Sequence, residues 1–292
     1  MIRSVARLAL CAFLVSFTLS AQTTPSATEL AAPYGSSQQQ AAKTRQPKLS
    51  RGILIPPYPP PFSRIAFGGG ISTMGINLET AVNVEKHLNL RGTGDLFNYT
   101  VNNISTHGFN VAAGLNLAAA GASLDYFPFA RHGLRISPGA LFYNKNEVRG
   151  TMVAAGGTSF TLNGVTYYSS QANPVTGVAS LDLHKQNPAP SLTLGWGNLI
   201  SRNGGHWSFP VEVGAAYIGQ PQVAMSFVSG QVCANAQGTV GCQDVVGNAS
   251  VNSNLQAQVA KDQKSLNPYR FYPIVSFGVG YSFGIHRASV LQ

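Results

Sequence analysis

The chain has 292 residues, of which only 10% are charged, while glycine occurs 31 times and aromatic residues make up 10%. Soluble domains carry about 25% charged residues because their surfaces face water, so this composition argues against a water-soluble globule. The formal net charge is +9, but residues 65–292 hold 12 basic and 9 acidic side chains, so most of the excess lies nearer the N-terminus. Basic residues interleaved with aromatic ones are missing, and we expect no nucleic-acid binding.

Residues 1–21 have the layout of a secretory signal peptide. Two arginines precede an apolar run from Leu8 to Leu19, and small residues lead to a cleavage site between Ala21 and Gln22. The apolar run is shorter than the roughly 20 residues that a membrane-spanning helix needs. The sequence therefore predicts an exported protein rather than one anchored by this segment.

Residues 22–62 are rich in Gln, Ser, Ala and Pro and end in the run IPPYPPPF. Proline-rich runs favour the extended polyproline II conformation and cannot join a β-ladder. We predict a disordered, basic periplasmic linker here, followed by a barrel over residues 63–284 and a tail over residues 285–292. The basic residues of the linker could reach the cell wall, but an ordinary solvated linker is the simpler interpretation.

Two cysteines, Cys233 and Cys242, lie nine residues apart in a segment rich in Gly, Ala and Asn. Export would place them in an oxidising compartment, so the spacing predicts a disulfide within a loop. A metal pair is less favoured because no histidine lies close in the sequence and the spacing matches no zinc pattern.

Alternation with a period of two runs from residue 65 onward and is clearest in FYPIVSFGVGYSF (Phe271–Phe283). The odd positions of this segment are apolar or aromatic, and the even positions are mostly small or polar. This pattern, with lipid outside and a lumen inside, is typical of a transmembrane β-strand of roughly 9–11 residues. The same pattern recurs in four other segments, Gly108–Leu117, Leu134–Tyr143, Ser191–Asn198 and Ser208–Tyr217.

A soluble β-sandwich also alternates and is the rival fold. Here the face that is not apolar carries glycine and serine more than lysine and glutamate, and aromatic residues lie near strand ends. These features favour an enclosed lumen and membrane girdles. We predict an all-β fold, a closed antiparallel transmembrane β-barrel of 8–12 strands with ten as the best estimate, in the bacterial outer membrane.

Two local signals add detail to this fold. Asn163-Gly164 predicts a two-residue hairpin turn between TSFTL and VTYYS. One short helix is expected in SNLQAQVAKDQKSLNP, between the last two main strands, with Ser253 at its start and Asn267-Pro268 at its end.

Three segments resemble small outer-membrane barrels of the OmpA/OmpW-like type, in particular a poorly characterised branch. They are SLDYFPFARHGLRISPGALFYN (Ser123–Asn144), LGWGN (Leu194–Asn198) and the terminal FYPIVSFGVGYSF. The resemblance implies contact with outer-membrane lipid and insertion by the barrel assembly machinery, which reads a final aromatic residue. The chain departs from this pattern, because Gly284–Gln292 follow Phe283.

Asp125, Arg135 and Glu212 fall on the face of their strands that is not apolar. Charges on that face must pair inside a narrow barrel, because an unpaired buried charge is costly. We predict a cluster of salt bridges in the lumen that either plugs the barrel or sets the selectivity of a narrow pore.

The leading functional hypothesis is an outer-membrane barrel with a structural or surface role and without catalysis. A narrow channel for small solutes and a lipid-modifying barrel enzyme are the alternatives. For the enzyme, His206 and Ser208 share a face with Glu212, but His206 and Glu212 would lie about 20 Å apart at roughly 3.3 Å per residue. No cofactor or metal motif is present in the sequence, and we expect none to be bound.

Overall fold

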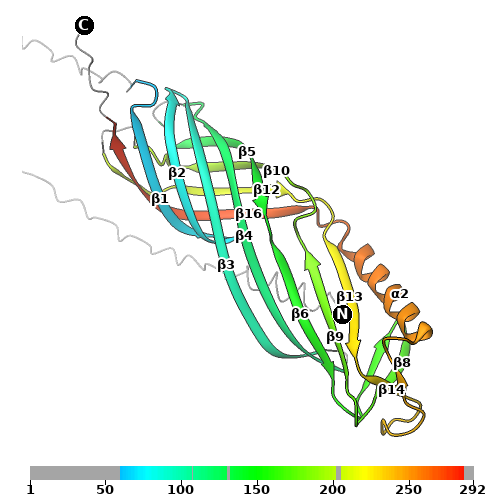
Figure 1. Cartoon of the computed structure of the whole chain (residues 1–292). Helices are drawn as coiled ribbons and strands as arrows, with labels where there is room; N and C mark the ends of the chain where they lie inside the picture. Colours follow the sequence, from blue (N-terminus) through cyan, green and yellow to red (C-terminus); the bar gives the residue numbers. More distant parts are fainter. Residues whose placement is uncertain (1–59, 107, 130–131, 202–204, 286–292) are drawn as a thin grey trace, which may run out of the picture.

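The structure is a computed structural model that describes residues 60–285, except for residues 107, 130–131 and 202–204. The predicted signal peptide, its cleavage site between Ala21 and Gln22, almost all of the predicted linker and nearly all of the C-terminal tail lie outside the described residues. The described part is all-β and antiparallel, as predicted, with one α-helix (Figure 1).

The strands form a large sheet of twelve strands and a small sheet of four. The large sheet consists of β1 (Arg64–Ser72), β2 (Gly75–Glu85), β3 (Leu88–Thr106), β4 (Phe109–Tyr126), β5 (Leu134–Asn144), β6 (Glu147–Ala154), β9 (Val175–Asp182), β10 (Ala189–Trp196), β11 (Trp207–Ser208), β12 (Val211–Tyr217), β13 (Gln222–Ser229) and β16 (Phe271–Gly284). The small sheet consists of β7 (Ser159–Leu162), β8 (Val165–Ser169), β14 (Gln231–Cys233) and β15 (Gln243–Asp244). The helix α2 (Ala249–Leu266) lies between β15 and β16.

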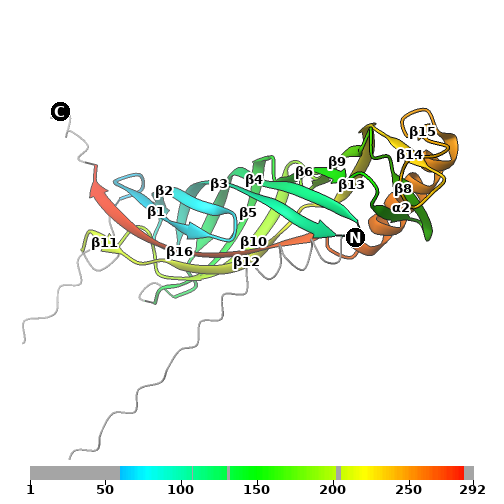
Figure 2. The same ribbon diagram turned by 90° about the horizontal axis from the view of Figure 1, so that it is seen from below.

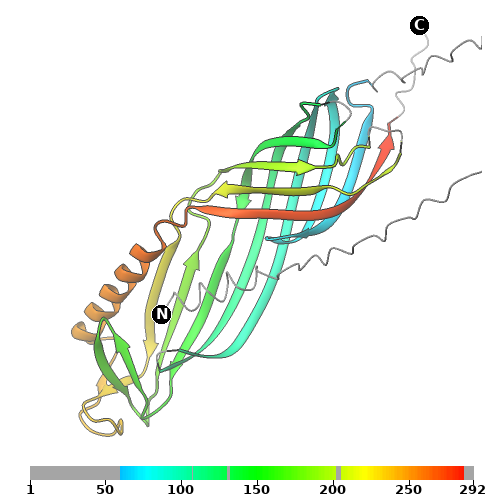
Figure 3. The same ribbon diagram turned by 180° about the vertical axis from the view of Figure 1, so that it is seen from behind.

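Eight strands of the large sheet follow one another in a circuit of pairings. From β4 the pairing passes through β3, β2, β1, β16, β12, β10 and β5 and returns to β4, where Ser123 lies opposite Gly139. Figure 3 shows β5, β10, β12 and β16 crossing in front of β1–β4, so that the strands surround an interior. The best estimate of ten strands is therefore wrong, because eight strands form the circuit and twelve form the sheet.

The other strands continue the sheet beyond the circuit. The strands β3 and β4 have 19 and 18 residues, well above the roughly 9–11 that cross a membrane. Beyond the circuit, residues 110–116 of β4 pair with β6, which pairs with β9, which pairs with β13. We call this part the extension and define it as residues 97–106 of β3, residues 109–117 of β4, β6, β9 and β13 (Figure 2).

The small sheet and α2 pack on one face of the extension, and we call them together the cap. Their contact is a hydrophobic core, whose buried members include Phe109 of β4, Phe160 of β7, Phe227 of β13 and Leu255 of α2. The predicted hairpin turn at Asn163-Gly164 joins β7 to β8 and therefore lies in the cap rather than in the barrel.

The helix begins five residues earlier than predicted. Its N-cap is Asn248, whose Oδ1 accepts hydrogen bonds of 3.1 Å from the backbone N–H groups of Ser250 and Val251, while Ser253 lies inside the helix. The helix ends at Leu266, as Asn267-Pro268 predicts. The missed start follows from the N-cap rule itself, since Asn is as good a cap as Ser and precedes Val251, the first buried residue of the helix.

Two of the predicted strands differ from the structure. The segment Ser208–Tyr217 is broken into β11 and β12, because Pro210 has no N–H to donate to the ladder. In Gly108–Leu117 the apolar side chains of Phe109 and Leu117 are buried on the inner face and do not face lipid. The predicted outward orientation of this segment is wrong, because its part of β4 belongs to the extension.

The exterior of the circuit is apolar. In β16, Val275 is 48% exposed and Phe277 is 55% exposed, whereas Ser276 between them is 8% exposed and faces inward. Other exposed apolar side chains on the exterior are Phe67, Ile71, Ile76, Leu78, Leu192, Leu194, Val211 and Val213. Water does not favour so continuous an apolar surface, whereas a lipid bilayer does. We call this surface the apolar belt.

Exposed aromatic residues lie at both ends of the circuit. At the end where β1 begins and β16 ends, they are Tyr126, Trp196, Trp207 and Phe283. At the end that carries the extension, they are Phe142, Tyr143, Tyr269 and Phe271. Two such girdles are typical of the membrane–water interfaces of a β-barrel. Within the described ranges, no helix combines the length and the hydropathy needed to cross a membrane.

Candidate functional site: a charged layer inside the barrel

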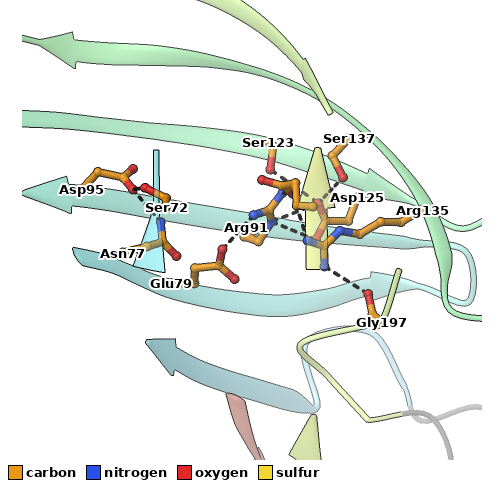
Figure 4. A network of polar contacts seen from close by, with 11 residues as sticks. Ser72, Asn77, Glu79, Arg91, Asp95, Ser123, Asp125, Arg135, Ser137 and Gly197 are labelled. Carbon is orange, nitrogen blue, oxygen red and sulfur yellow. Dashed lines mark hydrogen bonds and ion pairs between the residues drawn. The ribbon is translucent and has the colours of Figure 1, made fainter. Parts of the chain in front are cut away.

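Arg91 of β3 lies at the centre of a buried ion-pair network (Figure 4). Its Nε donates to both carboxylate oxygens of Asp125 at 3.1 Å, its Nη1 to Glu79 Oε1 at 3.1 Å and its Nη2 to Glu212 Oε2 at 2.5 Å. These three carboxylates come from β4, β2 and β12, and the Arg91 side chain is only 2% exposed. One guanidinium therefore connects four strands of the circuit.

Arg135 of β5 extends this network toward one end of the barrel. Its Nη2 donates to Glu212 Oε2 at 2.9 Å and its Nη1 to the carbonyl of Gly197 at 3.1 Å. The position opposite it on β10 is Gly195, where a Cβ atom would come within 2.6 Å of Arg135 Nε. Glycine at this position therefore makes the space in which the guanidinium lies.

Hydroxyl and amide groups complete the layer. Ser137 Oγ donates to Asp125 Oδ1 at 2.7 Å. Asp95 of β3 accepts from Ser72 Oγ at 2.6 Å and from Asn77 Nδ2 at 3.0 Å. We call Glu79, Arg91, Asp95, Asp125, Arg135 and Glu212 the charged layer, in which four carboxylates face two guanidinium groups.

The structure places all three sequence-predicted residues, Asp125, Arg135 and Glu212, in the charged layer. Arg135 contacts Glu212 directly, but Asp125 reaches the other two only through Arg91. The prediction omitted Arg91, Glu79 and Asp95. The same rule of alternation could have found Glu79 and Arg91, because NLET and LNLRG place an apolar residue on one face and a polar residue on the other.

Burial makes these contacts interdependent. An isolated buried charge is strongly unfavourable, and it is tolerated only with partners of opposite charge and satisfied hydrogen bonds. Loss of Arg91 would leave Glu79 and Asp125 without a cation, since Arg135 contacts only Glu212 among the carboxylates. The charged layer therefore ties β2, β3, β4, β5 and β12 together across the interior.

An apolar layer closes the interior on the side of the extension. Its buried residues are Met74, Ala119, Leu141, Ala189, Ala216 and Ile274, and Tyr272 packs against them. The hydroxyl of Tyr272 donates to the carbonyl of Thr73 at 2.9 Å. A cavity of only about 40 Å³ lies between this layer and the charged layer, which is room for a few water molecules at most.

A second apolar layer closes the opposite end, and it comes from the segment that follows β10. Leu199 and Ile200 pack against Ala66 of β1 and Ala81 of β2. A Cβ at Gly68 would come within 2.7 Å of Leu199 Cδ1, so glycine there allows the segment to enter the barrel. Side chains thus fill the described interior in three successive layers.

Polar contacts hold this segment, residues 197–201, in place. We call it the plug. Besides the bond from Arg135 to its first carbonyl, Asn89 Nδ2 donates to Asn198 Oδ1 at 2.8 Å, and Arg64 Nη1 donates to the carbonyl of Ser201 at 2.6 Å. The plug therefore has a fixed position relative to β1, β3 and β5.

The residues weighed for catalysis do not assemble into a catalytic group. His206 Nδ1 donates to the carbonyl of Ser282 at 2.8 Å, and Ser208 Oγ donates to the carbonyl of Leu199 at 3.1 Å. Glu212 is held by Arg91 and Arg135. A nucleophile needs its base within hydrogen-bond reach, and these three side chains are each engaged elsewhere.

Cys233 and Cys242 form a disulfide in the cap, in agreement with the sequence prediction. Of the residues that the structure describes, no three His, Cys, Asp or Glu side chains are grouped to hold a metal ion.

A larger hollow of about 700 Å³ lies on the face of the extension opposite the cap. It is lined mostly by small and hydroxyl-bearing side chains, including those of Thr100, Ala112, Gly114, Thr151 and Ser180. These side chains lie on the outer face of the sheet, the same face that carries the apolar belt in the circuit.

No protein-family model matches the chain, and no curated protein matches it at a significant level. The solved structures that are similar to it include two from Acinetobacter baumannii. CarO2 has 18% sequence identity and a TM-score of 0.50, over 75% of this chain and 98% of that one. CarO has 19% identity and a TM-score of 0.48, over 76% and 98%.

The likeness to CarO2 supports a β-barrel fold. The apolar belt and the two aromatic girdles are the exterior by which such barrels lie in the bacterial outer membrane. The surface thereby supports the predicted location in a membrane.

Proposed function

We propose that this chain is a closed outer-membrane β-barrel without catalytic activity, whose role is to hold the extension and the cap at the cell surface. The observation that carries this proposal is the filled interior. Two apolar layers enclose a charged layer, and the cavity between the charged layer and the apolar layer on the side of the extension is only about 40 Å³. A barrel of this kind serves as a membrane anchor for what it presents.

The arrangement of the two ends supports the orientation. Arg64 of β1 lies opposite Gly284 of β16, so both described ends of the barrel are on the same side. The turn between β2 and β3 on this side has only two residues, whereas the extension and the cap lie on the other side. Outer-membrane barrels have short periplasmic turns and long extracellular loops, so the extension and cap face the outside.

The narrow channel is the alternative that the interior bears on most directly. Conduction would require the plug and the apolar layer of Met74, Leu141 and Ile274 to move aside together. Among the residues that the structure describes, no geometry supports the lipid-modifying enzyme, since His206 and Ser208 are bonded to separate carbonyl groups. Membership of the OmpA/OmpW-like type, contact with the cell wall and recognition by the assembly machinery remain predictions.

The test is the conductance of the purified, full-length mature protein in planar lipid bilayers. We expect no current steps across the usual range of voltages. A variant with Leu199→Gly and Ile200→Gly, which removes the apolar side chains of the plug, serves as the comparison for detecting a partly opened lumen. Steady, voltage-independent conductance of the unmodified protein would reject the closed barrel in favour of the channel.

A further inference from the structure

Three cations lie on the rim of the barrel at the extension end, where β5 ends and where β10 and β16 begin. Lys145 follows the last residue of β5, Lys185 precedes β10, and Arg270 precedes β16. Each of these side chains is exposed. We call Lys145, Lys185 and Arg270 the basic rim.

Backbone contacts bring these residues into one band. Ile218 donates its N–H to the carbonyl of Arg270 at 2.9 Å and accepts from the N–H of Gln186 at 3.0 Å, which places Lys185 and Arg270 on either side of one segment. Next to this segment, Leu183 donates its N–H to the carbonyl of Asn146 at 2.9 Å. Asn146 follows Lys145 in the chain, and Leu183 lies two residues before Lys185. This hydrogen bond therefore brings Lys145 close to Lys185.

None of the three cations makes an ion pair within the described part of the chain. The acid nearest in sequence to Lys145 is Glu147, which is 18% exposed and is already held by Arg149, with Nε 2.8 Å from Oε1. The basic rim therefore keeps its positive charge available for a partner outside the protein, unlike the arginines of the charged layer.

The basic rim also lies directly beside an aromatic girdle. Lys145 Nζ lies 5.7 Å from the centre of the Tyr143 ring, and Arg270 is followed by Phe271, which is 64% exposed and packs edge-on against Tyr217. Aromatic girdles mark the level of the lipid headgroups. Cations at this level meet the headgroup phosphates of the leaflet.

We propose that the basic rim binds the phosphate groups of a glycolipid headgroup in the outer leaflet of the outer membrane. A phosphate ester on a sugar provides the anionic oxygens with which lysine and arginine form short, charge-assisted hydrogen bonds. This inference rests on the proposed function, because it needs the extension end of the barrel to face the outside.

The test measures binding of fluorescent lipopolysaccharide to the full-length mature protein in detergent. The rim variant carries Lys145→Gln, Lys185→Gln and Arg270→Gln. The matched control variant carries Lys86→Gln, Lys261→Gln and Lys264→Gln, which remove the same charge from the opposite end and from α2. We expect the rim variant to bind roughly tenfold more weakly or worse, and the control to bind within about twofold of the unmodified protein.

The chemistry of the ligand is tested by two further probes. Lipopolysaccharide whose phosphates have been removed should bind the unmodified protein as weakly as the intact glycolipid binds the rim variant. Inorganic phosphate at millimolar concentration should compete poorly, because it lacks the acyl chains that rest on the apolar belt. Equal binding of the intact and dephosphorylated glycolipid, or unchanged binding by the rim variant, would overturn the proposal.

A labelling experiment separates this proposal from the function on which it rests. The Gln256→Cys variant carries a thiol on an exposed position of α2 and should react with an impermeant maleimide in intact cells. Absence of labelling would reject the outward-facing orientation itself. Labelling together with unchanged glycolipid binding by the rim variant would reject the basic rim alone.

Discussion

The barrel and the extension are built from the same strands, yet their two faces have opposite polarity. In the part of β4 that belongs to the circuit, Asp125 faces inward and is fully buried, while Leu124 faces outward and is 45% exposed. In the part of the same strand that belongs to the extension, Phe109 faces inward and is 1% exposed, while Asn110 faces outward. Alternate side chains point inward and outward along the whole strand, but the medium outside the strand changes from lipid around the barrel to water around the extension.

This inversion locates the membrane boundary on the strand itself. Where the outside is lipid, apolar side chains lie outside and polar ones must find partners inside. Where the outside is water, the apolar side chains instead form a core, and here α2 and the small sheet cover it. The barrel and the extension therefore depend on different interactions, ion pairs in the charged layer and hydrophobic contacts beneath the cap.

The largest effect is expected from Arg91→Ala, which leaves buried carboxylates without their cation. Removal of one partner of a buried ion pair costs about 3–5 kcal/mol, so the barrel should unfold at a much lower temperature in a heat-modifiable gel shift. Arg149→Ala, which removes an exposed arginine from the extension, is the control and should leave the transition almost unchanged. Similar transitions for both variants would mean that the charged layer does not stabilise the barrel.

The next effect should destabilise the extension and the cap and leave the barrel intact. Phe160→Ala removes a ring that lies 4.8 Å from Phe109 and 6.1 Å from Phe227, measured between ring centres. A buried Phe→Ala change costs about 3–5 kcal/mol, and here the loss should be confined to the extension and the cap. Limited proteolysis should cut these parts while the heat-modifiable shift of the barrel persists. Simultaneous loss of both would show that the regions fold as one unit.

A smaller effect concerns the outer face alone. Val213→Arg places a charge on the apolar belt and should cost about 2–4 kcal/mol, as a charge at mid-membrane depth does. Thr151→Arg places the same charge on the outer face of the extension, where water solvates it, and should change the free energy of unfolding by less than about 0.5 kcal/mol. Urea titration of both variants in lipid vesicles measures the difference. Equal costs would remove the distinction between the two outer faces.

The smallest effect is local to the cap. Asn248→Ala removes the side chain that caps α2 and should destabilise the helix by about 1 kcal/mol, which would appear as faster amide exchange in the first turn. Ser253→Ala is the control and should leave that exchange unchanged, because Ser253 lies inside the helix.

The sequence predicted those features that depend on one strand at a time. The alternation of Phe271–Phe283 and Leu134–Tyr143 identified β16 and β5 to within one residue, because one face of each is apolar. The same rule placed Asp125, Arg135 and Glu212 on the inner face. It missed the central position of Arg91, because that position depends on which strands are neighbours, and β3 and β12 lie on different parts of the circuit.

The alternation of apolar and polar residues also did not predict the boundary between the barrel and the extension. Gly108–Leu117 alternates as regularly as β16 does, but alternation does not state which face is the inner one. That choice depends on β6, β9 and the cap, which supply the apolar partners of Phe109. Packing against residues distant in the sequence therefore determines which face of this segment points inward.

The central claim, that one strand passes from lipid to water with its outer face unchanged, has a direct test on β4. Single fluorescent probes would be attached through Ala122→Cys, Leu124→Cys and Asn110→Cys, all on the outer face, in protein inserted into lipid vesicles. A lipid-soluble quencher should quench the probes at positions 122 and 124 and leave the one at 110 bright, while a water-soluble quencher should do the reverse. Quenching of all three probes by the water-soluble quencher alone would contradict the account.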